Sequence, residues 1–487
     1  MSIPGALSFS IYVDWFNAHG KSTRLASIGP IMLICLNLPP SERLKPENVY
    51  DARTILGPKE PTALQLNYLL MPLIKELKEL WQGYHLSPTS TGPSGSFIHV
   101  AILTAIADVV AMCKLTGFIS HPGIHFCNFC TIQKAQIEEI GPQFHYTRSY
   151  QNHKSTIAKW LRATPQQRQE IFSEYGVRYS ILEDLPYWEA TRMVNLDIMH
   201  NLILEILKDH ATFKLCIPES KSRIYFRSHR KYNDTNSSDS DSMTSNSSLD
   251  KITLREAHSL RRDAEKIINE ALPTTSTQKT YHPMPTPHMQ HPSGGSEEIP
   301  SFDADYIPTS EIPSELDISA LSDHQIKGEA LEHLPQIMFD TIIPSSWTRV
   351  PHKMGSPSSG NLKAAEWALL YKVYIPFSML TQQMLSDEHK YTNTQRNMGQ
   401  SEETENELTK NTFHLINAIK IGTKGTVSMD DATAFAEHCK KFCLSNQHLF
   451  PKQKSKPNHH FADHIPKIFQ HWGPAQASAT WGYELVI

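Results

Sequence analysis

The chain has 487 residues, enough for two to four domains at roughly 100–200 residues each, or for one core with long insertions. Its 46 Lys and Arg against 50 Asp and Glu give a formal net charge of -4, which excludes a broadly basic nucleic-acid coat protein and a highly acidic disordered chaperone. The longest apolar run, residues 97–113, falls short of the ~20 residues of a membrane-spanning helix and contains Asp108, so we expect no membrane segment.

Strand-like and helical patterns alternate in the first part of the chain. Runs of β-branched, aromatic and aliphatic residues at 8–13, 28–38 and 97–106 predict buried strands. Between them, leucines at helical spacing predict a helix over residues 64–81. Strands that alternate with helices indicate an α/β protein. Helices are predicted further along at 151–175, 191–209, 364–383, 406–421 and 430–444.

The composition changes sharply between these two groups of elements. Residues 232–250 consist mostly of Ser, Asn, Asp and Thr, and residues 273–313 are dominated by Pro, Thr, Ser and His. Such segments bury too little apolar surface to offset the entropy of ordering, so we expect both to be disordered, with a short amphipathic helix at 254–272 between them. Ordered structure is expected to resume at Leu331.

Cysteines and histidines suggest a metal site. The seven cysteines are scattered and odd in number, which favours a reducing compartment over a disulfide framework. Cys127 and Cys130 form a CxxC pair that can bind one tetrahedral zinc with two further ligands, although two buried thiols or a redox pair remain alternatives. His459, His460 and His464 are dense enough to supply two nitrogen ligands, or they are solvated histidines in a loop.

Carboxylates at the ends of apolar runs suggest a second kind of site. Asp14 follows the first predicted strand, Asp108 interrupts another apolar run, and Glu484 lies in an aromatic segment. Converging carboxylates could hold two divalent metals roughly 3.5–4 Å apart for phosphodiester chemistry, but each could equally be a helix cap or an ion-pair partner. Asp197 and His200 lie on adjacent turns of a predicted helix, either as a polar edge or as an active-site wall that touches phosphate.

Short segments in a fixed order then resemble one family, the transposases of fungal CACTA (En/Spm)-type DNA transposons. The resemblance covers most of the chain outside the low-complexity stretch. It rests on VDWFN (13–17), LNLPP (36–40), PENV (46–49), GPKEP (57–61), LKELWQG (77–83), GVR (176–178), LPYW (185–188), DIMHN (197–201) and KAAEW (363–367).

This family is similar, more distantly, to the catalytic subunit of the V(D)J recombinase, where a CxxC lies 19 and 22 residues after the second catalytic Asp and an H-x4-H pair completes a zinc site. Here Cys127 and Cys130 follow Asp108 by 19 and 22 residues, and His459 and His464 have the H-x4-H spacing. The resemblance therefore implies a structural zinc on these four side chains.

The resemblance also implies the fold and the chemistry. The fold would be α/β: a ribonuclease-H-like mixed sheet core with a long, mainly helical insertion and a disordered segment. Asp14, Asp108 and Glu484, which follows the second zinc histidine by 20 residues, would hold Mg or Mn for phosphodiester hydrolysis and strand transfer. Glu366 is the rival third carboxylate, and His200 could donate a hydrogen bond to the scissile phosphate.

The domain arrangement follows from the same resemblance. We expect a ribonuclease-H-like core with the CxxC over residues 1–210, a largely disordered insertion over 211–330, and over 331–487 a helical insertion that returns to the core. Asp14 lies 13 residues after Met1 and the chain ends three residues after Glu484, so we expect a truncated copy, inactive in transposition.

Partners and location are likewise implied. The resemblance predicts a nuclear protein that binds transposon-end DNA, and it allows a homo-oligomer. With a net charge of -4, DNA contact would need local patches such as residues 223–231 or 255–262. The alternative is a non-catalytic, transposase-derived zinc-binding protein that binds DNA or protein.

Overall fold

The computed structural model describes residues 5–17, 27–57, 59–88, 90, 92–141, 146–215, 217, 334–345, 347–351, 354, 361–381 and 399–480. The two predicted low-complexity stretches, the predicted helix at 254–272, both basic patches and Glu484 lie outside these residues.

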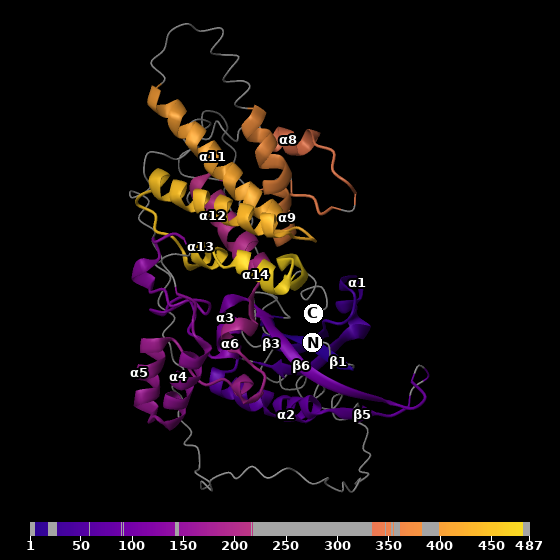
Figure 1. Cartoon of the computed structure of the whole chain (residues 1–487). Helices are drawn as coiled ribbons and strands as arrows, with labels where there is room; N and C mark the ends of the chain where they lie inside the picture. Colours follow the sequence, from indigo (N-terminus) through magenta and orange to yellow (C-terminus); the bar gives the residue numbers. More distant parts are fainter. Residues whose placement is uncertain are drawn as a thin grey trace, which may run out of the picture. The chain divides into compact units, whose positions relative to one another are not determined.

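The described residues contain a seven-stranded mixed sheet (Figure 1). Its strands run in space β4-β3-β1-β6-β7, with β2 paired to β3 and β5 paired to β6. β3 is antiparallel to both β1 and β4, whereas β1, β6 and β7 are parallel. The strands are β1 (Ala6–Val13), β2 (Phe16–Asn17), β3 (Ser27–Cys35), β4 (Val49–Leu56), β5 (Tyr84–Leu86), β6 (Ser96–Ala107) and β7 (Val194–Leu196).

Burial along the strands explains their composition. β1 ends with four consecutive buried residues, Ser10 to Val13, and β6 is buried over most of its second half. A strand that is covered on both faces has continuous apolar sequence, as observed here. Among the described strands β4 pairs with β3 alone, and its residues Asp51 and Arg53 are exposed. The polar residues in β4 therefore lie on an edge strand, where polar side chains are tolerated.

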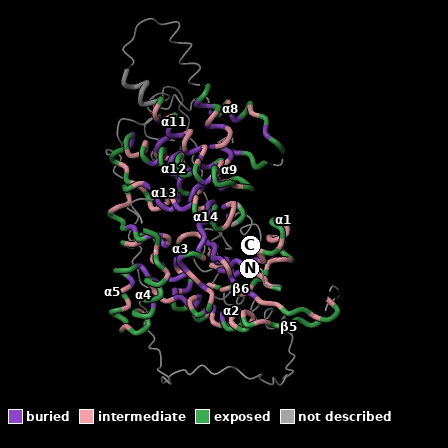
Figure 2. Tube along the Cα trace, in the orientation of Figure 1, coloured by how far each residue is buried: buried purple, intermediate pink, exposed green. Residues whose placement is uncertain are grey.

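Helices cover the sheet (Figure 2). α2 (Ala63–Gln82) begins with a capping box in which Thr62 and Gln65 exchange hydrogen bonds, and it buries Leu66, Leu70 and Leu77 in the core shared with β6. α3 (Val109–Thr116) begins directly after Asp108. The other helices in this part of the chain are α1 (Pro40–Arg43), η2 (Pro46–Asn48), η3 (Lys134–Gln136), α4 (Tyr150–Arg162), α5 (Pro165–Tyr175), η5 (Ile181–Asp184) and α6 (Ala190–Met193).

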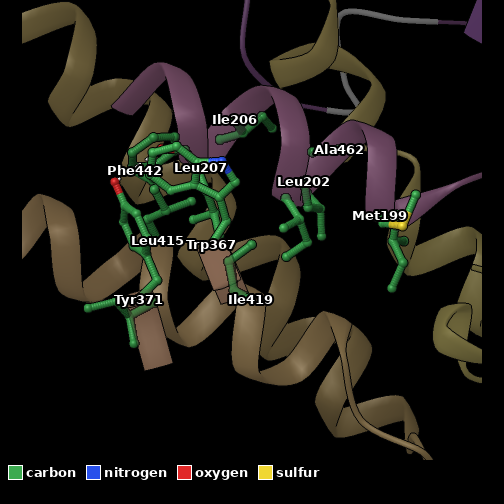
Figure 3. Packing of buried hydrophobic residues seen from close by; sticks show 14 of the residues in the cluster. Met199, Leu202, Ile206, Leu207, Trp367, Tyr371, Leu415, Ile419, Phe442 and Ala462 are labelled. Atoms are coloured by element: carbon green, nitrogen blue, oxygen red, sulfur yellow. Dashed lines mark hydrogen bonds between the residues drawn. The ribbon is translucent and has the colours of Figure 1, made fainter. Parts of the chain in front are cut away.

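A second core is helical and combines segments that precede residue 218 with segments that follow residue 333. Leu207 lies beside Trp367, Leu415 and Phe442 in this core (Figure 3). α11 and α12 lie side by side in it (Figure 1). Its elements are η6 (Met199–Leu207), η7 (His210–Lys214), α8 (Leu334–Asp340), α9 (Ala364–Leu369), η12 (Leu370–Tyr374), α11 (Gly399–Gly422), α12 (Met429–Leu449), α13 (Pro457–Ala462), α14 (Ile465–Trp472) and η13 (Ala475–Ser478).

The mixed α/β class is confirmed, as are the strands predicted at 8–13, 28–38 and 97–106 and the helix at 64–81. The helix predicted at 191–209 is wrong in its first part, because residues 194–196 form β7 at the side of β6. The helix predicted at 151–175 is two helices, since Thr164 caps α5 and Pro165 occupies its first turn. Within the described part of the chain, no helix is long and apolar enough to span a bilayer.

Candidate functional site

Four buried side chains from two distant segments meet at one point. Cys127 and Cys130 lie in the loop that follows α3, His460 lies in α13, and His464 lies between α13 and α14. The Cys127 sulfur is 3.3 Å from Nε2 of His464, and the Cys130 sulfur is 3.2 Å from Nε2 of His460. The two Nε2 atoms are 3.1 Å apart, and all four ligand atoms lie within 4.8 Å of one another.

These separations are close to those of a tetrahedral zinc site, the three shortest being at or slightly below the lower end of the range. Zinc binds sulfur at about 2.3 Å and imidazole nitrogen at about 2.0–2.1 Å, which places ligand atoms about 3.3–3.8 Å apart at tetrahedral angles. Two thiols and two imidazoles, all buried, are a donor set that zinc prefers. The four residues therefore form a Cys2His2 cluster that could bind zinc.

The protonation of the two thiols favours a metal ligand role. Hydrogen bonds from the Cys127 thiol and then from His460 and His464 lower the pKa of Cys130 to about 2. Burial raises the pKa of Cys127, which keeps the second proton on this sulfur in the absence of a cation. One thiolate is thus already favoured, and a divalent cation would displace the remaining proton.

The loop that carries the cysteines is fixed by a single arginine. The Arg148 guanidinium donates to the backbone carbonyls of Cys127 at 2.8 Å and of His125 at 3.0 Å. The backbone N–H of Phe129 donates to the Cys127 sulfur at 3.4 Å. Rings also pack around the imidazoles, since the Phe129 ring centroid is 4.9 Å from that of His464. The ligands are therefore held in place by contacts that involve no metal.

His459, predicted as a zinc ligand, lies outside this cluster, and His460 takes the place expected for it. The Nδ1 atom of His459 accepts a hydrogen bond from the Lys456 backbone N–H at 3.0 Å, and its ring stacks on Phe442. The reason is backbone geometry: Asp463 and His464 keep a right-handed helical conformation beyond the end of α13, so side chains four apart, as in His460 and His464, lie on the same side, whereas side chains five apart diverge.

Asp14 and Asp108 lie at the same edge of the sheet. β1 and β6 are parallel and pair in register up to Tyr12 and Ile106, two residues before each aspartate. The carboxyl ends of these neighbouring strands therefore place both aspartates together, each directly after its strand. The Asp108 carboxylate also caps α3, where it accepts a hydrogen bond from the Ala111 N–H at 2.7 Å.

The environment of Asp14 disfavours a lone negative charge. Burial raises the pKa of Asp14, and the nearby Asp108 carboxylate raises the pKa further. Hydrogen bonds from the Trp15 N–H at 2.7 Å and the Tyr12 hydroxyl at 3.1 Å act in the opposite direction, as does His200. Asp14 therefore lies close enough to Asp108 for the second carboxylate to disfavour its ionisation.

Trp15 fixes the segment that carries Asp14. Its ring packs directly on the backbone of β3 at Gly29, where a Cβ atom would lie 1.8 Å from Cζ3 of the indole. Only glycine leaves room for the ring at this position.

Asp197 is a third aspartate at this edge. It directly follows β7, which pairs in parallel with β6 up to Leu196 and Ala107. It is buried, its carboxylate contacts His200 Nδ1, and it accepts hydrogen bonds from the Thr480 hydroxyl at 2.7 Å and the Thr480 N–H at 3.0 Å. Asp197 therefore orients the His200 ring and holds the chain next to residue 480. The contact with Thr480, 283 residues away, has no signal in the sequence.

The two candidates for the third carboxylate differ in position. Glu366 accepts a hydrogen bond from the Lys363 backbone N–H at 2.6 Å and so caps α9 in the helical core. Glu484 lies outside the described residues. In the part of the chain that is described, Asp14 and Asp108 belong to no group of three or more metal-ligating side chains.

Comparison with known proteins adds one finding. Residues 4–172 match the model of the family described as transposase family tnp2. The matched segment contains β1 to β6, both edge aspartates and both zinc-site cysteines, but not His200, His460 or His464. No curated protein matches the chain. The match supports a transposase-derived protein.

Proposed function

We propose that the chain derives from a DDE-type DNA transposase of the CACTA type, with a ribonuclease-H-like core and a structural zinc site. The reaction of this lineage is metal-dependent phosphodiester hydrolysis followed by strand transfer. The proposal assigns Asp14, Asp108 and Glu484 to the divalent metals. It assigns a hydrogen bond to the scissile phosphate to His200.

The position of Asp14 and Asp108 is the observation that carries the proposal. Both follow neighbouring parallel strands in register, within the segment that matches the transposase family. The strand order β4-β3-β1-β6-β7, with only β3 antiparallel to its neighbours, also supports a ribonuclease-H-like sheet.

The residues fit Mg or Mn chemically, since oxygen ligands suit both ions. Burial, and to a smaller extent the Asp108 carboxylate, raises the pKa of Asp14, and a bound cation would offset this cost. Bound metal would activate water or a DNA 3′-hydroxyl and would stabilise the leaving oxygen. The chain itself supplies orientation. Asp197 contacts Nδ1 of His200 and thereby orients the ring.

The zinc site has a structural role in this proposal. Four protein ligands leave no open coordination position, as in structural rather than catalytic zinc sites. The site would tie the loop after α3 to α13 and α14, which return from the far side of the helical insertion. DNA ends as the partner, a nuclear location and a homo-oligomer are proposals from the same lineage.

Asp108→Asn tests the catalytic assignment without loss of the helix cap. Asparagine caps helices about as well as aspartate, so the melting temperature should stay close to that of the wild type. We expect the variant to bind Mn²⁺ at least tenfold more weakly by calorimetry. We also expect it to lose any nicking of supercoiled plasmid in Mg²⁺ or Mn²⁺.

Asp51→Asn, on the exposed edge strand β4, is the matched control and should change neither property. Equal Mn²⁺ binding by the wild type and Asp108→Asn would contradict the metal assignment. Metal binding that depends on Asp108 without any nicking would favour the second candidate, a non-catalytic zinc-binding protein of transposase origin. This candidate is favoured by one observation: among the described residues, the Cys2His2 cluster brings four buried metal-ligating side chains together, whereas Asp14 and Asp108 belong to no such group of three or more.

A further inference from the structure

A cavity of about 290 Å³ lies between η7, the end of α12 and the loop that leads into α13. Three lysines and one aspartate carry the charges of its lining. We call it the lysine pocket, and the residues that matter for its chemistry are Asp209, Lys214, Asn446, Lys454, Lys456 and His459.

Lys214 is the most unusual of these residues. Only 5% of its surface is exposed, although it carries an ammonium group. Its Nζ lies 4.5 Å from the centre of the Phe450 ring. Among the residues with described positions, no hydrogen bond or ion pair to this ammonium is present. A cation–π contact with phenylalanine compensates only part of the cost of removing an ammonium from water.

The one acidic side chain of the pocket is already paired. Asp209 Oδ1 lies 2.6 Å from Nζ of Lys456, whose side chain is 45% exposed. Burial, with a smaller contribution from the Lys456 ammonium, lowers the pKa of Lys214 to about 8 against the opposing effect of Asp209. The pocket therefore holds more positive than negative charge, and no ion pair to its deepest ammonium is present in the described part of the chain.

One wall of the pocket is fixed from outside. The Glu138 carboxylate accepts hydrogen bonds from Gln447 Nε2 at 3.0 Å, from the Ser455 N–H at 2.8 Å and from the Ser455 hydroxyl at 2.7 Å. These contacts join α12 to the loop that carries Lys454 and Lys456. Hydrogen bonds thus hold the loop with Lys454 and Lys456 in place, which lowers the entropic cost of binding a ligand between the lysines.

A second unpartnered group belongs to another residue of the pocket lining. Oδ1 of Asn446, another lining residue, is buried and accepts no hydrogen bond within the described structure. Buried acceptors normally have a donor, so a bound ligand with a hydroxyl group would satisfy it. An unpaired cation together with an unpaired acceptor indicates a ligand that is anionic and also carries a donor.

We propose that the lysine pocket binds a phosphate group, with Lys214 and Lys456 as its cationic contacts and Asn446 as acceptor for a hydroxyl of the same ligand. A phosphate monoester has the charge and the oxygen atoms for two ammonium groups from different elements. Its source is either a small phosphorylated ligand or the phosphate of a nucleic acid strand. This inference does not depend on the proposed catalytic carboxylates.

The test uses Lys214→Met, which keeps a long apolar side chain on Phe450 but removes the charge, and Lys456→Met. Lys452→Met is the matched control, because Lys452 is exposed in the same loop but does not line the pocket. The probe is inorganic phosphate, titrated into the zinc-loaded full chain in chloride buffer by calorimetry and by thermal shift. We expect the wild type and Lys452→Met to bind it, and the two pocket variants to bind it at least tenfold more weakly.

The stability of Lys214→Met separates a binding role from a structural one. If Lys214 serves a ligand, the variant without phosphate should melt at the wild-type temperature or above, since an unpaired buried charge is gone. A lower melting temperature with unchanged phosphate binding would overturn the proposal, as would a wild type that binds no phosphate. Tighter binding of a nucleoside 5′-monophosphate than of an unphosphorylated oligonucleotide would assign a small ligand, and the reverse would assign the strand.

Discussion

Replacement of His460 by glutamine should remove the zinc site, whereas the same change at His459 should leave it intact. The two histidines are adjacent, yet only His460 Nε2 lies against the Cys130 sulfur, at 3.2 Å. His459 Nδ1 instead accepts a backbone hydrogen bond from Lys456. The two variants thus carry the same substitution, histidine to glutamine, at adjacent positions. We expect only His460→Gln to lose zinc binding.

The magnitude follows from the length of chain that the metal would close. Cys130 and His460 are 330 residues apart. In the chain-entropy model, a cross-link over a loop of this length lowers the entropy of the unfolded chain by the equivalent of about 6 kcal/mol, which is an upper bound. A loss of this size should lower the melting temperature by on the order of 10 °C or more.

The assay is metal analysis of purified protein together with thermal unfolding. We expect about one zinc per chain in the wild type and in His459→Gln, as for a four-ligand structural site, and less in His460→Gln. Chelation should lower the melting temperature of the first two proteins to that of His460→Gln. A full equivalent of zinc in His460→Gln, or its loss from His459→Gln, would refute the assigned ligand set.

Two further predictions concern the core. Gly29→Ala should destabilise the fold by about 1–3 kcal/mol and change the fluorescence of Trp15, because the added Cβ would lie 1.8 Å from the indole. Urea unfolding that is the same in the variant and the wild type would argue against this contact. Burial, and to a smaller extent the Lys214 ammonium, lowers the pKa of His210 to about 3. When the pH falls below ~6.5, the unfolded chain therefore binds a proton at His210 while the folded chain does not. The free energy of unfolding then falls by up to about 1.4 kcal/mol per pH unit. Comparison of urea unfolding at pH 7.5 and 5.5 should show this slope in the wild type and a shallower slope in His210→Gln; equal slopes would contradict a neutral buried imidazole.

The sheet was largely predictable from sequence, because its central strands are buried on both faces. The apolar runs that form β1, β3 and β6 are long and bounded by polar or proline residues, so their period and composition were sufficient to predict strands. β7 was missed since it has three residues, Val194 to Leu196, and these continue the helical spacing of the residues that follow. Only pairing with β6, which the sequence does not reveal, makes them a strand.

The metal cluster was predictable in three of its four residues. Cys127 and Cys130 have the spacing of a metal pair, and His464 was expected with them. The fourth ligand was placed at His459 by resemblance to another protein, whereas the helical period alone favours His460. A local physical rule would therefore have corrected the assignment. No comparable rule links Asp197 to Thr480, since their contact depends on the whole intervening fold.

The shared helical core has a consequence for how the polypeptide could be divided. Residues 196–217 and 334–479 supply one apolar cluster, and the cysteines and histidines of the metal cluster come from opposite sides of residues 218–333. The sheet core lies wholly before residue 218, but the helical core needs residues from both sides of this interval. The shared helical core then holds the two parts of the chain together more than the covalent link through residues 218–333 does. Two separately encoded polypeptides, divided within this interval, could therefore assemble into the same folded structure around one metal ion.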